Sequence, residues 1–232
     1  MILSSLVYAF FGGLAPSLVW LYFLLKEDSR CPEPRRLIAL AFIAGMAAVP
    51  LALPLEILAQ ARLGGTPILA WAIIEEMLKY LMAAIFILWR RAVDEPPDYV
   101  IYMMTVALGF AAAENMLFLF APLSAGRLAL GFFTSDQRFM GATLLHVIAS
   151  SVVGFALALS RAAHPLRRIF AVIAGLILAI ALHTAFNTII MQNSGASTLD
   201  AFFLVWVAVV VVFAALETLK YFRYRDLPPN TC

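Results

Sequence analysis

Long apolar runs separated by short polar stretches dominate the chain. Seven such runs can be followed, at approximately 3–25, 37–60, 67–89, 100–121, 137–160, 169–191 and 199–219. Each is close to the roughly 20 residues that a helix needs to cross the hydrocarbon core of a bilayer. The stretches between the runs are short and carry turn and charge signals, so consecutive helices are expected to be antiparallel. The pattern predicts an all-α fold, a polytopic membrane bundle of about seven transmembrane helices.

The composition agrees with this pattern. Hydrophobic residues make up 64% of the chain and charged residues 13%, and the mean hydropathy is +0.95. These values lie outside the range of soluble domains, so we expect an integral protein of the cell (inner or plasma) membrane, with the lipid bilayer as its surroundings. The formal net charge of +2 gives no reason to expect nucleic acid as a partner. Seven spans leave little of the 232 residues for a soluble part, so residues 1–232 are expected to form a single domain.

The basic residues predict the orientation of the bundle. The first, third and fifth connections and the carboxy-terminal tail carry twelve Lys and Arg residues, whereas the alternate connections carry three, Arg62, Arg127 and Arg138. Cytoplasmic connections of membrane proteins carry the excess of positive charge. The amino terminus is therefore predicted to be extracytoplasmic and the carboxy terminus cytoplasmic.

The third apolar run is interrupted by charge. The stretch WAIIEEMLKYL at 71–81 contains Glu75, Glu76 and Lys79, where a lipid-facing helix would carry apolar residues. A purely structural role would be an ion pair between Glu75 and Lys79, four residues apart on one helix. Glu75 and Glu76 point about 100° apart on a helix, so they are expected to hold different roles.

Ionisable residues on four different runs lie at one predicted depth. Glu75, Glu114, His146 and His183 each stand seven to nine residues from the predicted outer end of their helix. This places them ~10–14 Å below the extracytoplasmic surface. Each such residue costs roughly 2.5–3.5 kcal/mol to insert, so residues of this kind normally face the bundle interior and mark a functional site.

This set of side chains suits hydrolytic chemistry. Two histidines and one glutamate form a known ligand set for catalytic zinc, and a further glutamate can take the proton of the attacking water. The same residues also fit two alternative roles. Polar side chains join helices in membranes, and chains of Glu and His mark the pathways of proton- or ion-coupled transporters.

Four spaced motifs resemble those of the PrsW intramembrane proteases. EEMLK at 75–79 is similar to the EExxK motif and FAAAE at 110–114 to the FxxxE motif, and HVIAS at 146–150 and HTAFN at 183–187 supply the histidine motifs. The wider group includes CAAX prenyl endopeptidases and bacteriocin-processing membrane proteases. Lys79 replaces the arginine of that group at a shifted position, and Glu114 stands where it has a histidine. These departures favour the PrsW branch, and they leave zinc and a metal-free glutamic protease as alternatives.

The resemblance implies a multi-pass endopeptidase with a motif-bearing core at about 67–191. It would cut a single-span membrane protein, such as an anti-sigma factor in a site-1 cleavage, near its extracytoplasmic boundary. The oligomeric state has no signature in the sequence. Our hypothesis takes Glu75 as the general base, held ionised by Lys79, and Glu76 as a supporting acid or alternative ligand. The remaining expected site residues are the zinc ligands Glu114, His146 and His183 and the oxyanion-stabilising Asn187.

Overall fold

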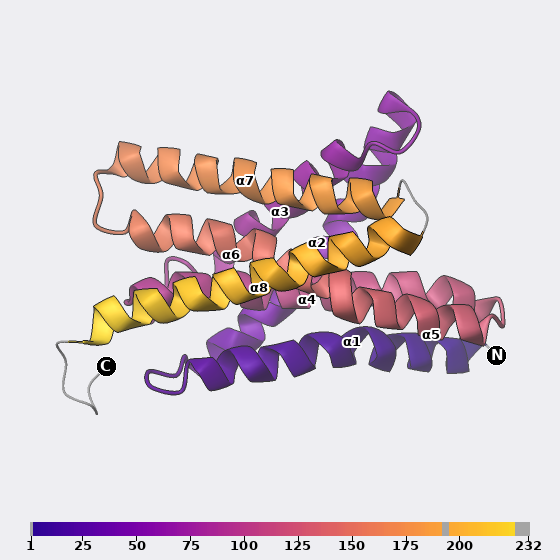
Figure 1. The fold of residues 1–232 in the computed structure, drawn as a ribbon, viewed down its shortest axis with the longest axis horizontal. Helices are drawn as coiled ribbons and strands as arrows, with labels where there is room; N and C mark the ends of the chain where they lie inside the picture. The colour runs from indigo at the N-terminus through magenta and orange to yellow at the C-terminus, as the bar shows by residue number, and fades with distance from the viewer. Residues whose placement is uncertain (1, 192–194, 226–232) are drawn as a thin grey trace.

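The computed structural model describes residues 2–191 and 195–225 of the chain, and within them every regular element is a helix. The all-α prediction is confirmed. Of the roughly seven predicted spans, six correspond to described helical stretches that are long and apolar enough to cross a membrane, and the charged run at 67–89 does not meet that measure. Figure 1 shows the helices and their connections. In chain order the elements are α1 (Ile2–Glu27), α2 (Arg35–Leu63), α3 (Ile68–Phe86), α4 (Pro96–Ser124), α5 (Leu128–Gln137), the π-helical turn η1 (Arg138–Ala142), α6 (Thr143–Leu159), α7 (Pro165–Met191) and α8 (Gly195–Tyr224).

Helix α3 corresponds to the predicted third run and carries its three charges. With 19 residues it measures about 28 Å, close to the thickness of a hydrocarbon core. Its charged residues are buried inside the protein and do not face lipid, because Ala72, Glu75, Glu76, Lys79 and Met82 lie on the face that packs into the bundle. The charge in this run therefore belongs to the interior of the bundle.

The fifth predicted span begins earlier than its sequence suggests. The polar residues before 137 predict a connection, but the helix starts at Leu128 and continues through α5 and η1 into α6. The break from α4 is made by Gly126, whose φ of 72° is in the left-handed region. The predicted helix start is nine residues too late because polar side chains near a membrane surface do not by themselves end a helix.

Helix α4 is the centre of the bundle and packs against α1, α2 and α6. Its residues from 97 to 112 are all buried. Glycines bring the neighbouring backbones close: a Cβ at Gly45 of α2 would clash with the carbonyl of Val106, and one at Gly109 of α4 with the carbonyl of Phe42. Small residues of this kind allow membrane helices to pack tightly. The close packing of α4 thus fixes the positions of the helices around it.

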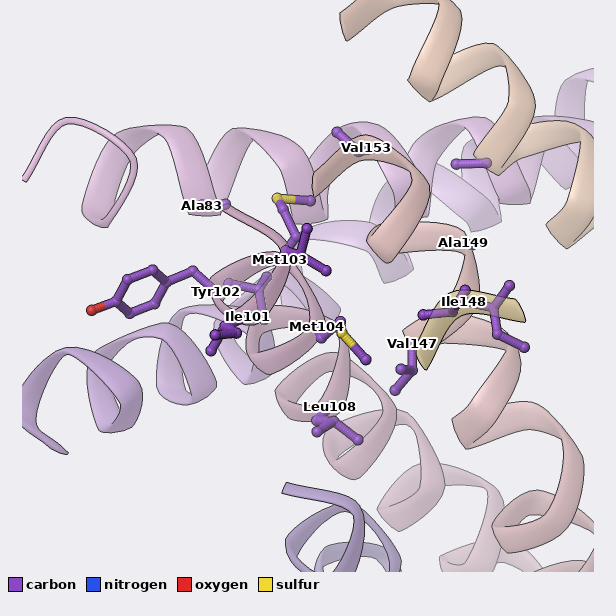
Figure 2. Packing of buried hydrophobic residues seen from close by; sticks show 14 of the residues in the cluster. Ala83, Ile101, Tyr102, Met103, Met104, Leu108, Val147, Ile148, Ala149 and Val153 are labelled. Carbon is purple, nitrogen blue, oxygen red and sulfur yellow. The ribbon is translucent and has the colours of Figure 1, made fainter. Parts of the chain in front are cut away.

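A buried apolar cluster joins α4 to α6. Met104 and Leu108 of α4 belong to it together with Val147 and Ile148 of α6, as Figure 2 shows in close-up. All four are at most 5% exposed. This packing sets the register between α4 and α6, and therefore the relative heights of Glu114 and His146.

The connections rich in Lys and Arg meet at one end of the bundle. In Figure 1 the α1–α2 and α6–α7 connections lie at the same end as the last turn of α8. Arg30 stacks 4.7 Å from the ring centroid of Tyr224, and Arg223 forms an ion pair of 3.1 Å with Glu95. The alternation of connections on which the orientation rests is therefore present in the fold, while the orientation itself stays a prediction.

Candidate active site

The charges of α3 meet the histidines of α6 and α7 in the interior. Glu75, Glu76 and Lys79 are at most 5% exposed, and His146 and His183 are at most 2% exposed. The rings of the two histidines lie 5.1 Å apart, centroid to centroid, and are nearly perpendicular. Residues more than 100 positions apart in the chain thus form one polar cluster.

Lys79 pairs with a different glutamate from the one expected. Its Nζ donates to Glu76 Oε1 at 2.7 Å, whereas Glu75 Oε2 lies 3.8 Å away. The ammonium also lies 4.5 Å from the ring centroid of Phe110, a cation–π contact. The close ion pair is therefore the i,i+3 pair, and the i,i+4 pair with Glu75 is the longer one.

The partners of His146 define which of its nitrogens carries the proton. Nδ1 lies 2.8 Å from Lys79 Nζ, and Nε2 lies 2.8 Å from Glu114 Oε2. An ammonium can only donate and a carboxylate accepts, so Nδ1 is the acceptor and Nε2 carries the hydrogen. The unprotonated nitrogen of His146 therefore faces α3.

The same reasoning applies to His183. Its Nδ1 lies 2.8 Å from Glu76 Oε1, so this nitrogen carries the hydrogen and donates it to the carboxylate. In the neutral imidazole the other nitrogen, Nε2, is then the one without a hydrogen, and it lies 3.8 Å from Glu75 Oε2. Glu76 thus receives hydrogen bonds from both His183 and Lys79.

Glu75 completes the cluster with an unpaired oxygen. Its Oε2 is buried and has no hydrogen-bond partner among the described residues. This oxygen lies 3.9 Å from the unprotonated Nδ1 of His146 and 3.8 Å from the unprotonated Nε2 of His183. Three acceptor atoms from three helices therefore lie close together, and one of them, His146 Nδ1, is bound by the ammonium of Lys79. Such a group of acceptors is favourable only when cations or donors lie among them.

The arrangement fits a metal ion. Glu75, His146 and His183 each offer one ligand atom, and these atoms lie within 4.8 Å of one another. The second nitrogen of each histidine is hydrogen-bonded to a carboxylate, as is usual for metal-ligating histidines. The Lys79 ammonium now donates to His146 Nδ1, which is one of the three proposed ligand atoms. For a metal ion to bind this nitrogen, Lys79 must give up its hydrogen bond to His146, and it can keep its bond to Glu76.

Glu114 contacts only the outer side of this cluster. It accepts hydrogen bonds from His146 Nε2 at 2.8 Å and from Arg138 Nη2 at 2.5 Å, and its side chain is 19% exposed. The geometry therefore places Glu75, and not Glu114, with the two unprotonated nitrogens. Asn187 lies one helical turn beyond His183 on α7 and is half-buried.

The sequence pattern does not single out Arg138 as a site residue. Arg138 counts among the few basic residues of the outer connections, because the residues before it have the polar pattern of a connection. A charged residue eight positions before a buried histidine on one continuous helix is the signal that could have drawn attention to it.

Comparison with known proteins adds an independent finding. The sequence model of the PrsW family intramembrane metalloproteases matches residues 33–216. The chain belongs to the PrsW family. It is 27% identical over 228 residues to Protease PrsW of Geobacillus kaustophilus (strain HTA426), covering 94% of this chain and 95% of that relative. To Protease PrsW of Bacillus subtilis (strain 168) it is 29% identical over 113 residues, 47% of this chain and 52% of the relative. No solved structure matches.

Membership of the PrsW family confirms the resemblance seen in the four motifs. The protein is a multi-pass membrane protease, and this decides between the protease and the ion-coupled transporter. The family is described as a metalloprotease family, which agrees with a site that can accept a cation. The motifs at 75–79, 110–114, 146–150 and 183–187 bring their acidic and histidine residues into one connected network of contacts.

Proposed function

We propose that this protein hydrolyses a peptide bond of a single-span membrane protein, with a zinc ion held by Glu75, His146 and His183. The observation that carries the proposal is the convergence of three acceptor atoms, one of them an unpaired, buried carboxylate oxygen. Two imidazoles and a carboxylate are a common ligand set of catalytic zinc. Zinc bound there would polarise the scissile carbonyl and lower the pKa of a bound water to about 7.

The remaining charged residues support this ligand set. Glu114 accepts a hydrogen bond from Nε2–H of His146 and Glu76 accepts one from Nδ1–H of His183, and these bonds keep the other nitrogen of each ring turned inward. Such partners orient the ligands and raise their basicity. Lys79, fully buried and 3.8 Å from Glu75 Oε2, is placed to stabilise negative charge that develops beside the site. Asn187 is proposed as a second contact for the oxyanion.

We further propose that the substrate is cut close to its extracytoplasmic boundary. The predicted depth of the cluster, ~10–14 Å from the outer surface, supports this position. Glu114 and Arg138, with side chains 19% and 13% exposed, are the members of the network closest to the protein surface. An anti-sigma factor with one transmembrane span is the proposed substrate. The whole chain, with its core at about 67–191, is proposed to act as one protease domain.

Cleavage by purified protein tests the proposal. The protein in detergent is incubated with a single-span test substrate, with and without a chelator, and zinc is then added back. We expect cleavage that the chelator abolishes and zinc restores. Cleavage that persists in chelated, metal-free protein would overturn the zinc site in favour of a glutamic protease with Glu75 as the base. No cleavage of any membrane substrate tested would count against the endopeptidase itself.

A further inference from the structure

Arg138 lies at the junction between the protein surface and the buried cluster. It is the first residue of the π-helical turn η1, and its side chain is 13% exposed. Its Nη2 donates to Glu114 Oε2 at 2.5 Å, and its Nε donates to Asn115 Oδ1. The guanidinium group lies 4.1 Å from the ring centroid of Phe118. The Arg138 side chain therefore contacts three residues of α4, Glu114, Asn115 and Phe118.

The π-helical turn brings Arg138 onto the same face as His146. The two residues are eight positions apart, and at about 100° per residue an uninterrupted α-helix would separate them by roughly 80°. In η1 the backbone N–H of Thr143 donates to the carbonyl of Arg138, an i to i+5 bond that takes up one extra residue. Eight residues then turn about as far as seven would, leaving roughly 20° between the two side chains.

Both side chains consequently reach the same oxygen. Glu114 Oε2 lies 2.5 Å from Arg138 Nη2 and 2.8 Å from His146 Nε2. The neighbouring Asn115 is 1% exposed and donates from Nδ2 to Thr143 Oγ1 at 3.1 Å. These bonds connect α4 to η1 and to the first residue of α6. The carboxylate of Glu114 is thereby fixed in direction, and with it the hydrogen bond that it accepts from His146.

We propose that Arg138 is a positioning residue, which holds Glu114 against the Nε2–H of His146 and so fixes the direction of the imidazole ring, whose Nδ1 accepts from Lys79 and lies 3.9 Å from Glu75 Oε2. The proposal rests on the function proposed above, because it assigns Nδ1 as the atom that the site uses. π-Helical turns are frequent at functional sites, and here the turn has a specific effect, the alignment of a surface guanidinium with a buried imidazole. The guanidinium matters through its geometry as well as its charge, since it bridges Glu114 and Asn115 at once.

The decisive measurement is the hydrogen bond that His146 donates from Nε2. Nitrogen NMR of histidine-labelled, metal-free protein in detergent is compared for wild type, Arg138→Met, Arg138→Lys and the control Arg127→Met, whose residue is exposed. Lys79 holds Nδ1 as an acceptor in all of these proteins, so the Nε2–H resonance reports the position of Glu114. The resonance should move in Arg138→Met, stay close to the wild type in Arg138→Lys, whose ammonium still pairs with Glu114, and be unchanged in the control. An unchanged Nε2–H resonance in Arg138→Met overturns the proposal.

Two further measurements separate this inference from the proposed function. Zinc affinity by competition with a chelator should fall about 10-fold in Arg138→Met, the lower end of the effect of outer-shell partners. The kcat of cleavage should fall in Arg138→Met while KM stays nearly unchanged. Added guanidinium ion should restore part of the cleavage activity of Arg138→Ala. If the wild type cleaves and binds zinc, and Arg138→Met has the same cleavage rate and zinc affinity, the role of Arg138 is overturned and the proposed function stands. A wild type that neither cleaves nor binds zinc would overturn the function, and the Nε2–H resonance of His146 would still decide the role of Arg138.

Discussion

The buried Oε2 of Glu75 lies 3.8 Å from the unprotonated Nε2 of His183, and no described group donates a hydrogen bond to that oxygen. Two acceptors that face each other in the interior lose their hydration without gaining a bond, at a cost of about 1–3 kcal/mol for each unsatisfied group. A cation bound between these two atoms would remove this cost, so the pair favours cation binding at this point.

Replacing Glu75 with glutamine should abolish cleavage and weaken zinc binding. The amide cannot serve as an anionic ligand, and its NH₂ can donate to His183 Nε2, so the melting temperature should stay the same or rise. We expect cleavage to fall by at least about 100-fold, more than outer-shell changes cause. Glu217→Gln, whose side chain is 57% exposed, is the matched control. Full zinc affinity without cleavage would instead identify Glu75 as the general base.

Replacing His183 with alanine should remove zinc from the purified protein. Loss of one of three proposed ligands is expected to lower zinc affinity by more than about 100-fold, since outer-shell partners alone contribute about 10- to 100-fold. The control is His164→Ala in the exposed α6–α7 connection. Metal content of both variants is measured by elemental analysis, and equal zinc in the two would refute the ligand set.

Replacing Lys79 with methionine should destabilise the fold. The change removes the ammonium that lies 2.7 Å from Glu76 and leaves that fully buried carboxylate with His183 at 2.8 Å and the Ser150 hydroxyl at 3.5 Å. Breaking one side of a buried ion pair costs about 3–5 kcal/mol. Lys26→Met, on the exposed end of α1, should leave stability nearly unchanged. Thermal unfolding in detergent is the measurement, and similar melting temperatures for the two variants would contradict the role of Lys79.

Stability should fall as the pH rises from 4.5 to about 8. Glu33 lies in the α1–α2 connection, and its burial raises its pKa from 4.5 to about 8, although the hydrogen bond from Tyr102 acts in the opposite direction. A carboxyl with a higher pKa in the folded than in the unfolded chain favours folding at low pH, and this contribution is lost as the pH rises to about 8. Glu33→Gln should flatten the dependence of melting temperature on pH. A variant with the wild-type slope would argue against this group.

The carboxy terminus should lie in the cytoplasm. The expectation rests on twelve basic residues on one side of the membrane against three on the other. A reporter that is active only in the cytoplasm, fused after the last residue, should be active in cells. A reporter active only outside would reverse the orientation and place the cluster in the inner half of the bilayer.

Much of the fold can be predicted from the sequence. Apolar runs of membrane-spanning length are sufficient to predict helices, because a backbone in lipid has no other way to satisfy its hydrogen bonds within one segment. The high cost of charge in lipid likewise predicts that Glu75, His146 and His183 face inward. The start of α5 at Leu128 is not predicted, because polar residues near the surface and a connection look alike in sequence.

The sequence by itself determined that the charged residues of the apolar runs turn inward, and the tertiary structure decided which of them pair and what each does. Glu75 and Glu76 are neighbours in the chain, yet one has an oxygen without a hydrogen bond and the other binds both Lys79 and His183. Nothing local to the chain distinguishes them, because the choice depends on the rotation of α3 against α6 and α7. The link between Arg138 and Glu114 depends in the same way on one π-helical turn, whose extra residue changes the direction of a side chain without changing the apolar pattern.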